Sequence, residues 1–350
     1  MTRGLRSVDS TLLATLREQT LSVWEEVIGR DTAVALLDVP NQRNAGDSLI
    51  WAGEREYLAR LGCRVAYTSD LSSFDADRLR RAMPEGVILM HGGGNFGDIW
   101  FGHQAHRERI ARQMRDYRIV CLPQTVYFGS RDRAQIANDA LSSHPDLTLL
   151  VRDRPSAIRA CEQLPDIAVR FCPDAALGAP ISPSRRRSRA RRILVLARKD
   201  REGSSSLDQR SAEWLPGRRV VIADWAPSGP RAVLWAASRK VLLVELRLRR
   251  FTRTGIPARV ADASAAGALA LINRLNVSMA RALFRRADYL IADRLHAHIL
   301  ASLLGMSHVV LDNSYGKVRA IFDDYTGSFT TAQFADDLDD ARGHALEETL

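Results

Sequence analysis

The sequence predicts an α/β fold in which two Rossmann-like domains face each other across a cleft. The runs AVALLDV, GVILMHG and LTLLV are apolar throughout rather than alternating, as in parallel strands that are buried on both faces. Patterns typical of amphipathic helices lie between these runs. The alternation of strand and helix occurs twice, before and after a polar segment at 180–192, which indicates two units joined by a linker.

The first alternation begins after a helix predicted within 9–30, where apolar residues recur at helical spacing. A second helix is predicted from Ile50, Tyr57 and Leu61, with Gly62 as its C-terminal stop. These elements form a predicted N-terminal domain, residues 1–179. Its expected strands are 33–39, 63–68, 87–91, 118–122, 147–151 and 167–172.

The segment 180–192 reads PISPSRRRSRARR and is predicted to be a linker or exposed loop. A C-terminal domain is expected over 193–332, although its arginine-rich part at 246–261 matches no clear element. The acidic tail at 333–350 is expected to be a frayed helix or disordered. The strands expected in the C-terminal domain lie near 193–197, 219–223, 241–244, 288–292 and 308–311.

Composition places the chain among ordinary globular proteins. Its 350 residues are 46% hydrophobic and 26% charged, which is ample for a packed core. No run of about 18 uncharged apolar residues suggests a membrane span. The N-terminus lacks the apolar region of a signal peptide, so a cytoplasmic protein is expected.

The net charge of +9 favours anionic partners, which include nucleic acid, an anionic membrane surface and anionic substrates. No nucleic-acid motif accompanies the charge, so no nucleic-acid partner is expected. The run RRRSRARR is either a solvated segment or a peripheral contact with anionic lipids. No CxxC pair or His/Cys cluster has the spacing of a zinc site, so no metal is expected.

The most distinctive motif is HGGGNFGD, which follows the apolar run 87–90 directly. Three glycines after a strand predict a tight loop whose backbone can approach a ligand closely. The loop either cradles an anion or sugar, aided by the next helix N-terminus, or is a turn that merely needs glycines. His91 is either part of the site or a core histidine. The candidate residues are His91, Gly92, Gly93, Gly94, Asn95 and Asp98.

A second polar cluster, Asn44, Gly46 and Asp47, follows the first predicted strand. Asp47 or Ser48 can cap the helix that follows. Alternatively Asp47, with Asp98, binds the hydroxyls of a sugar acceptor. The alternative for the two aspartates is to brace the loops.

Cationic residues follow two further strands. Arg152 or Arg154 can form a fork onto a carboxylate or phosphate, although an ion pair with Asp153 or Asp174 explains them equally well. Downstream, Arg294 and His296 bracket Leu295 at the end of a predicted strand. A histidine there is suited to proton transfer at neutral pH.

Lys317 lies about twenty residues after His296, beyond the strand expected at 308–311. It can return to the same edge of the sheet as a point charge for phosphate. Three cations are therefore expected at one site.

Together the motifs NAGDSLIWAGE, HGGGNFGDIW, VRDRPS and DRLHAHILASLLGMSHVVLDNSYGKV resemble those of the polysaccharide pyruvyl transferases. The likeness extends over about 33–320 and is closest to the bacterial exopolysaccharide ketal-pyruvate transferases. It implies a fold like that of GT-B glycosyltransferases, with phosphoenolpyruvate as donor, phosphate as the second product and no metal or nucleotide cofactor.

The resemblance also implies roles for particular residues. Arg152, Arg294, Leu295, His296 and Lys317 fall on the phosphoenolpyruvate-binding motifs, and the acceptor side falls on the glycine-rich segment with Asp98. The expected product is a sugar that bears a cyclic pyruvate ketal. Its acceptor is a polysaccharide, a lipid-linked oligosaccharide or a glycolipid. His296 is the expected general acid.

The main alternative is a nucleotide-sugar-dependent glycosyltransferase on the same GT-B architecture. It predicts binding of a nucleotide diphosphate sugar and indifference to phosphoenolpyruvate. A second alternative is a sugar- or anion-binding module without catalysis, which predicts donor binding without release of phosphate.

Overall fold

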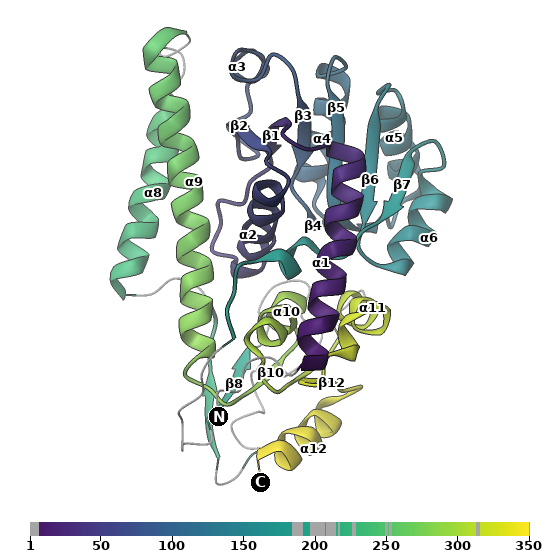
Figure 1. Cartoon of the computed structure of the whole chain (residues 1–350), viewed down its shortest axis with the longest axis vertical. Coiled ribbons are helices and arrows are strands. Elements are labelled where there is room, and N and C mark those ends of the chain that lie inside the picture. Colours follow the sequence, from purple (N-terminus) through teal and green to yellow (C-terminus); the bar gives the residue numbers. More distant parts are fainter. Residues whose placement is uncertain are drawn as a thin grey trace.

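The computed structural model describes residues 7–183, 192–196, 207, 215, 218–225, 229–248, 251, 254–312 and 316–349. These residues form a mixed α/β fold with two sheets, and every pairing within them is parallel. Figure 1 shows the first sheet at the top right and the second below it. The predicted parallel α/β class is therefore confirmed.

The first sheet has the strand order β2-β1-β3-β5-β6-β7, with β4 paired to β5 outside this path. The chain leaves β1 for β2 and then returns to the other side of β1 as β3. This reversal is the topological switch point at which such sheets bind ligands. The strands are β1 Ala33–Leu37, β2 Arg64–Thr68, β3 Val87–Met90, β4 Gly93–Gly97, β5 Arg118–Tyr127, β6 Leu147–Val151 and β7 Ala168–Phe171.

Helices cover both faces of this sheet, which explains its continuous apolar strands. Val34 and Leu36 pack in a core shared with α1 and α2, whereas Ala35 and Leu37 pack in a second core with α4 and α5. The helices are α1 Ser7–Ile28, α2 Ala45–Arg60, α3 Ala76–Ala82, α4 Phe101–Gln113, α5 Arg131–Ser142, α6 Arg154–Gln163 and the 3₁₀ turn η1 Ala175–Gly178.

The second sheet has the order β12-β11-β10-β8-β9. Four strands expected from the sequence, near 193–197, 219–223, 288–292 and 308–311, are confirmed as β8 to β11. The elements are β8 Arg192–Leu196, β9 Arg219–Ile222, β10 Tyr289–Ala292, α10 Leu295–Leu304, β11 His308–Val310, α11 Lys317–Asp324, η3 Thr326–Ser328, β12 Ala332–Phe334 and α12 Leu338–Thr349.

The strand predicted at 241–244 is wrong, because these residues belong to helix α8, Gly229–Leu248. Its buried residues recur at helical spacing, which the apolar run VLLVEL conceals. Helix α9, Gly255–Phe284, packs against α8 and also against α2 beside the first sheet. Of the unassigned region 246–261, residues 246–248 belong to α8 and residues 255–261 to α9. The two helices lie side by side at the left of Figure 1.

The acidic C-terminal segment is folded, contrary to the expected frayed or disordered tail. Strand β12 pairs with β11, and α12 buries Ala341 and Ala345 against the second sheet. The proposed linker at 180–192 is described only at its two ends, because residues 184–191 lie outside the described part of the chain.

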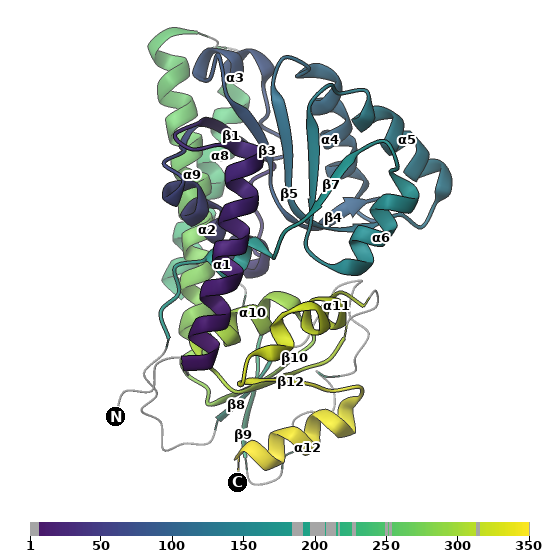
Figure 2. The same ribbon diagram turned by 45° about the vertical axis from the view of Figure 1, so that its right-hand side comes forward.

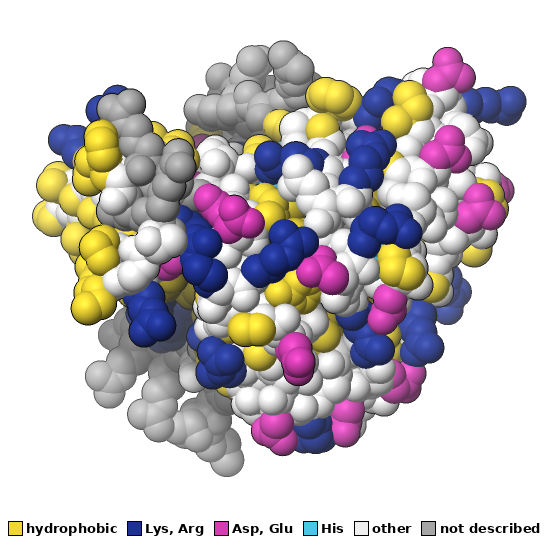
Figure 3. All heavy atoms as spheres, turned by 90° about the horizontal axis from the view of Figure 1, so that it is seen from above, with side chains coloured by type: hydrophobic (Ala, Val, Ile, Leu, Met, Phe, Trp, Pro, Cys, Tyr) yellow, Lys and Arg dark blue, Asp and Glu magenta, His cyan; other side chains and the backbone are white. Residues whose placement is uncertain are grey.

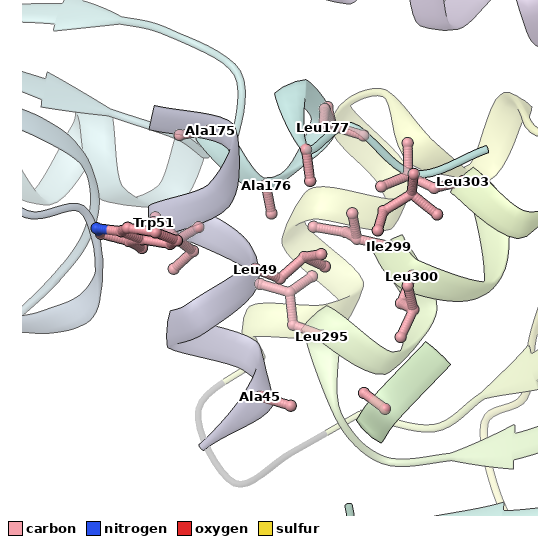
Figure 4. Close-up of a cluster of buried hydrophobic side chains, with 14 of the residues drawn as sticks. Ala45, Leu49, Trp51, Ala175, Ala176, Leu177, Leu295, Ile299, Leu300 and Leu303 are labelled. Carbon is pink, nitrogen blue, oxygen red and sulfur yellow. The ribbon is translucent and has the colours of Figure 1, made fainter. Parts of the chain in front are cut away.

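An apolar interface joins the two sheets through α2, η1 and α10 (Figure 4). Leu49 of α2 lies near Leu295 and Ile299 of α10, and these side chains belong to one buried core. Helix α1 runs alongside both sheets in Figure 2. Its Asp9 accepts hydrogen bonds from the backbone and hydroxyl of Thr330 at 2.8 Å.

Candidate active site

A cavity of ≈ 520 Å³ lies at the carboxyl ends of strands from both sheets. Arg152 reaches it from the end of β6 in the first sheet, and Arg294 reaches it from the end of β10 in the second. Its lining consists of Gln42, Arg43, Asn44, Gly46, Asp47, Gly94, Asn95, Trp100, His103, Arg152, Asp224, Trp225, Arg294, Leu295, His296 and Lys317.

The structure distinguishes the two arginines that the sequence left open. The side chain of Arg152 is 2% exposed and lines the cavity, whereas that of Arg154 is 80% exposed and pairs with Asp324 on the surface. Arg152 donates from Nη1 to Asp174 at 2.6 Å and from Nε to Thr125 at 3.0 Å. Arg152 therefore forms the predicted ion pair with Asp174 and also lines the cavity.

Asp174 is the buried anion that organises this side of the cavity. Burial alone would raise the pKa of its carboxyl, but the charge of Arg152 and the hydrogen bond from His296 hold that pKa well below its ordinary value. Tyr325 accepts a hydrogen bond from the Asp174 amide and donates one to the Arg152 carbonyl, each at 3.1 Å. The carboxylate thus stays ionised and fixes both neighbours.

His296 is the second residue of α10, at the helix end that faces the cavity. Its Nε2 lies 3.5 Å from an oxygen of Asp174 and 3.4 Å from Nη1 of Arg152. Its ring approaches the first turn of α2 so closely that a Cβ at Gly46 would lie 2.9 Å from Nδ1. The imidazole is therefore oriented by residues of the first sheet and their following helix.

Arg294 is the N-cap residue of α10, and Leu295 separates it from His296 in the sequence. Its guanidinium carbon is 5.5 Å from the ring centroid of Trp225, and Nη2 is 3.9 Å from Asp224. Trp225 and Asp224 follow β9, so the second sheet supplies both the cation and its support. Leu295 is buried in the core between α2 and α10 and borders the cavity with its apolar side chain.

Lys317 begins α11 and reaches across to the first sheet. Its Nζ donates to the carbonyl of Gly94 at 3.2 Å. A Cβ at Gly94 would lie 2.9 Å from Nζ and 3.1 Å from Nη2 of Arg152. Glycine at this position therefore lets two cations meet beside the β4 backbone.

The glycine-rich segment is a strand rather than the predicted tight loop. Residues 93–97 form β4 and pair with β5, because these glycines allow close contact between backbones. A Cβ at Gly97 would lie 1.7 Å from the Tyr127 carbonyl, and its φ of 131° is accessible mainly to glycine. Within the motif, Gly94 and Asn95 line the cavity.

His91, Gly92, Gly93 and Asp98 lie outside the cavity lining. His91 is buried with Nδ1 2.8 Å from Glu54, which also accepts from the Gly92 amide. Burial would lower the pKa of His91, but Glu54 raises it above its ordinary value. Asp98 accepts hydrogen bonds from the amides of Gly129 and Ser130 at 2.9 Å. It therefore braces a loop, which was the predicted alternative to binding a sugar hydroxyl.

The predicted helix cap at the start of α2 is wrong in its residue, because Asn44, and not Asp47 or Ser48, caps the helix. Asn44 is the helix cap, accepting from the Gly46 amide at 2.9 Å and donating to Asp47 at 2.8 Å. All three residues also line the cavity. The hydrogen bond from Asn44 thus holds Asp47 in place in the cavity lining.

Sequence reasoning missed a second histidine in the cavity. The Nδ1 of His103 on α4 lies 2.8 Å from Asp38, a buried residue with φ of 60° directly after β1. Burial would raise the pKa of Asp38, but the hydrogen bond and charge of His103 lower it below its ordinary value. A positive φ in a non-glycine residue is strained and concentrates at functional sites.

Within the described residues, no group of three or more His, Cys, Asp or Glu side chains could hold a metal ion. The cavity instead combines four cations, Arg43, Arg152, Arg294 and Lys317, with two histidines. Such a set can bind an anion with two charged groups and move protons on both sides of it.

Comparison with known proteins agrees with this chemistry. The family described as polysaccharide pyruvyl transferase matches residues 44–315. A Bacillus subtilis protein named as a pyruvyl transferase, EpsO, is 28% identical over 86% of this chain and 87% of its own. Pyruvyl transferase 1 of Schizosaccharomyces pombe is also 28% identical, over 90% of this chain and 75% of its own.

A solved structure supports the fold. The crystal structure of a functionally uncharacterised Klebsiella pneumoniae protein is similar over 95% of this chain and 99% of that one, with a TM-score of 0.55. The two sequences are 16% identical, so the likeness concerns the fold alone.

Proposed function

The chain belongs to the polysaccharide pyruvyl transferase family, and from this premise we propose that phosphoenolpyruvate is its donor and a cyclic pyruvate ketal its product. One observation carries the proposal. Arg152 follows β6 of the first sheet, Arg294 and His296 lie at the start of α10, and Lys317 begins α11. All four line one cavity.

Phosphoenolpyruvate carries a carboxylate and a phosphate, and a site for it needs several cations. Arg152 is held rigidly by Asp174 and Thr125, so its remaining Nη2 donors are oriented before the donor binds. Arg294 and Lys317 supply charge from two other elements of the second sheet. The three cations thus bracket an anion with two charged ends.

In the proposed reaction His296 donates a proton to the methylene carbon of the donor, which leaves an oxocarbenium-like centre. One sugar hydroxyl attacks this centre and loses its proton. The bond to phosphate then breaks, and a second hydroxyl of the same sugar closes the ring. Two hydroxyl protons are released in total. One replaces the proton that converted the methylene group to a methyl group, and the other leaves on phosphate.

The attacking hydroxyl needs a base, and His103 is suited to accept its proton. Asp38 holds the Nδ1 side of the ring, so Nε2 is the nitrogen left for a ligand in the cavity. Asp47 and Asn95 also line the cavity and can bind other hydroxyls of the acceptor.

The acceptor in this proposal is a sugar of a polysaccharide, a lipid-linked oligosaccharide or a glycolipid. The enzyme acts in the cytoplasm or at the inner face of an anionic membrane, with no metal or nucleotide cofactor and no nucleic-acid partner. The two sheets are proposed to be Rossmann-like domains of a GT-B-like enzyme, with domains at 1–179 and from 193 onward. The second domain extends past the predicted boundary at 332, because it includes β12 and α12.

The test is calorimetric binding of phosphoenolpyruvate, beside a panel of nucleotide sugars, to the wild type, Arg294→Gln and Arg154→Gln. Arg154 is the matched control, because it is an exposed arginine outside the cavity. Wild type and Arg154→Gln are expected to bind phosphoenolpyruvate equally, and Arg294→Gln to bind at least about tenfold more weakly. Binding of a nucleotide sugar instead, with none of phosphoenolpyruvate, would favour glycosyl transfer.

A further inference from the structure

The α8–α9 hairpin exposes an apolar surface that the cavity does not use. Ten of the eighteen exposed large hydrophobic side chains in the described part of the chain lie between residues 233 and 260. Figure 3 shows hydrophobic side chains gathered at the left, where α8 and α9 lie in Figure 1, with Lys and Arg side chains beside them. Apolar patches of this kind mark interaction surfaces.

Five exposed apolar residues of α8 form one continuous stripe, and Leu234, Leu243 and Leu246 are exposed outside it. Helix α8 buries Trp235, Ser238, Leu242 and Glu245 on one face. Next to that face, exposed apolar residues recur every three or four residues between 233 and 248. This spacing aligns them along the helix. Val233 is 71% exposed and Val244 51%. The stripe consists of Val233, Ala237, Val241, Val244 and Leu248.

The charges on the hairpin are sorted by sign. Its acidic residues, Glu245 and Asp262, both accept hydrogen bonds from Arg78 of α3, at 3.1 and 2.5 Å, and so face the body of the protein. The fully exposed charged residues in the described part of the hairpin are all cations: Arg231, Lys240, Arg247, Arg259 and Arg274.

Two of these cations flank the apolar stripe. Lys240 is seven residues after Val233, and Arg247 is seven after Lys240, so both lie beside the stripe on its far side from the buried face. An apolar stripe bordered by cations is typical of helices that lie in a membrane interface. Anionic headgroups supply the complementary charge.

A second copy of the chain fits this surface poorly. A two-fold interface would place the same patch on both sides, so the cations of one copy would face those of the other without exposed acids between them. An anionic bilayer offers both an apolar layer and negative charge.

We propose that the outer face of the α8–α9 hairpin docks onto the surface of an anionic lipid bilayer. The aliphatic side chains of the α8 stripe enter the boundary between headgroups and acyl chains, and Lys240 and Arg247 contact lipid phosphates. The occupant is thus a lipid surface with negative charge.

The hairpin lies on the bilayer and does not cross it. Among the described residues, α9 is the one helix long and apolar enough for a span. However, Leu269 and Ile272 pack in the core with α2, and Asn273 and Asn276 donate to the carbonyls of Pro40 and Gln42 at 2.8 and 2.9 Å. These contacts hold α9 against the protein body.

The proposal is tested by co-sedimentation of the full chain with vesicles of phosphatidylcholine, alone or mixed with phosphatidylglycerol. The wild type is expected to bind the mixed vesicles, and to bind less as salt is raised. Val241→Ser/Val244→Ser and Lys240→Gln/Arg247→Gln are each expected to weaken binding about tenfold or more. These exposed positions leave the core intact, which circular dichroism checks.

Matched controls separate a specific surface from general stickiness. Ile158→Ser removes an aliphatic residue on α6 that is 59% exposed, and Arg112→Gln/Arg131→Gln removes two exposed cations from α4 and α5. Both controls are expected to bind vesicles like the wild type. If they lose as much binding as the hairpin variants, general charge and hydrophobicity explain the effect and the proposal is overturned.

Two other results would also overturn it. One is the absence of wild-type binding to either vesicle. The other is a concentration-dependent dimer, measured by light scattering, that Val241→Ser/Val244→Ser abolishes. That result would make a second copy of this chain the occupant of the stripe.

Discussion

Gly46 and His296 touch across the two sheets, with only 2.9 Å between the ring Nδ1 and the position a Cβ at residue 46 would occupy. Asp174 and Arg152 hold the other side of the same ring. The orientation of the imidazole therefore depends on the absence of one methyl group in the first turn of α2.

Gly46→Ala is expected to reduce turnover by about tenfold or more, because a displacement of a catalytic group by a fraction of an ångström is costly. Helix propensity alone would favour alanine by up to about 1 kcal/mol, whereas its Cβ would crowd His296 and Asn44, so stability is measured beside turnover. Phosphate release and thermal unfolding are measured together. The matched control is Gly102→Ala, also at the second position of its helix, where a Cβ would only touch Leu71 at 3.8 Å. Equal activity in the two variants would contradict the role of the contact.

His296→Gln is expected to lower kcat by about 10²–10⁴-fold while phosphoenolpyruvate still binds, because the three cations remain. Calorimetry gives the binding and phosphate release gives kcat. His344→Gln on α12, outside the cavity lining, is the control. Unchanged turnover in His296→Gln would remove this residue from the mechanism.

Asp174→Asn is expected to destabilise the fold by about 3–5 kcal/mol near pH 7, since it leaves the buried Arg152 cation unpaired. The folded-state pKa of Asp174 is depressed. The ionised carboxylate of Asp174 therefore stabilises the fold in full above the ordinary carboxyl pKa. This stabilisation is lost progressively as the pH falls from there through the lowered folded-state pKa. The stability difference between wild type and variant, from denaturant titrations, should narrow as the solution is made acidic.

Asp116→Asn provides the comparison. The hydrogen bond from Arg80 lowers the pKa of Asp116 as well, but this pair is exposed. Exposed pairs contribute about 0–1 kcal/mol. A loss in Asp116→Asn as large as that in Asp174→Asn would show that burial of the pair is not the cause.

His103→Gln and Asp38→Asn are both expected to lower turnover about 10²-fold or more with phosphoenolpyruvate affinity retained, if the pair removes the acceptor proton. The neighbouring His106→Gln is the control, because burial lowers the pKa of His106 to about 4 and the residue lies outside the cavity lining. The pH profile of turnover should change in the first two variants and stay unchanged in the third. Loss of donor binding in His103→Gln would instead place His103 on the donor side.

The sequence allowed most strands of both sheets to be predicted, because parallel strands buried on two faces tend to be short and apolar. Strands β4 and β12 were not predicted. The run 241–244 follows the same rule and yet is helical. Its outer residues are exposed, and only packing of Leu242 and Glu245 toward the body distinguishes the two structures. Local composition does not contain that information.

Arg152 and Arg294 were predictable because each closely follows a strand, where the fold brings side chains together. Lys317 was predicted from its place after β11, whereas Arg43 was not predicted. The pairing of His103 with Asp38 was not predictable, since it joins residues 65 apart in the chain with no recognisable motif around either. The glycine-rich segment was misjudged for a related reason. Glycines permit a tight turn and a close strand pairing equally well, and the partner β5 decides between them.

Helix α9 connects the proposed docking surface to the candidate site. At about 1.5 Å per residue its 30 residues extend about 45 Å. Five residues after Phe284 the chain enters β10, and Arg294 and His296 follow that strand. One helix therefore links the surface that is proposed to meet a bilayer with two residues that line the cavity.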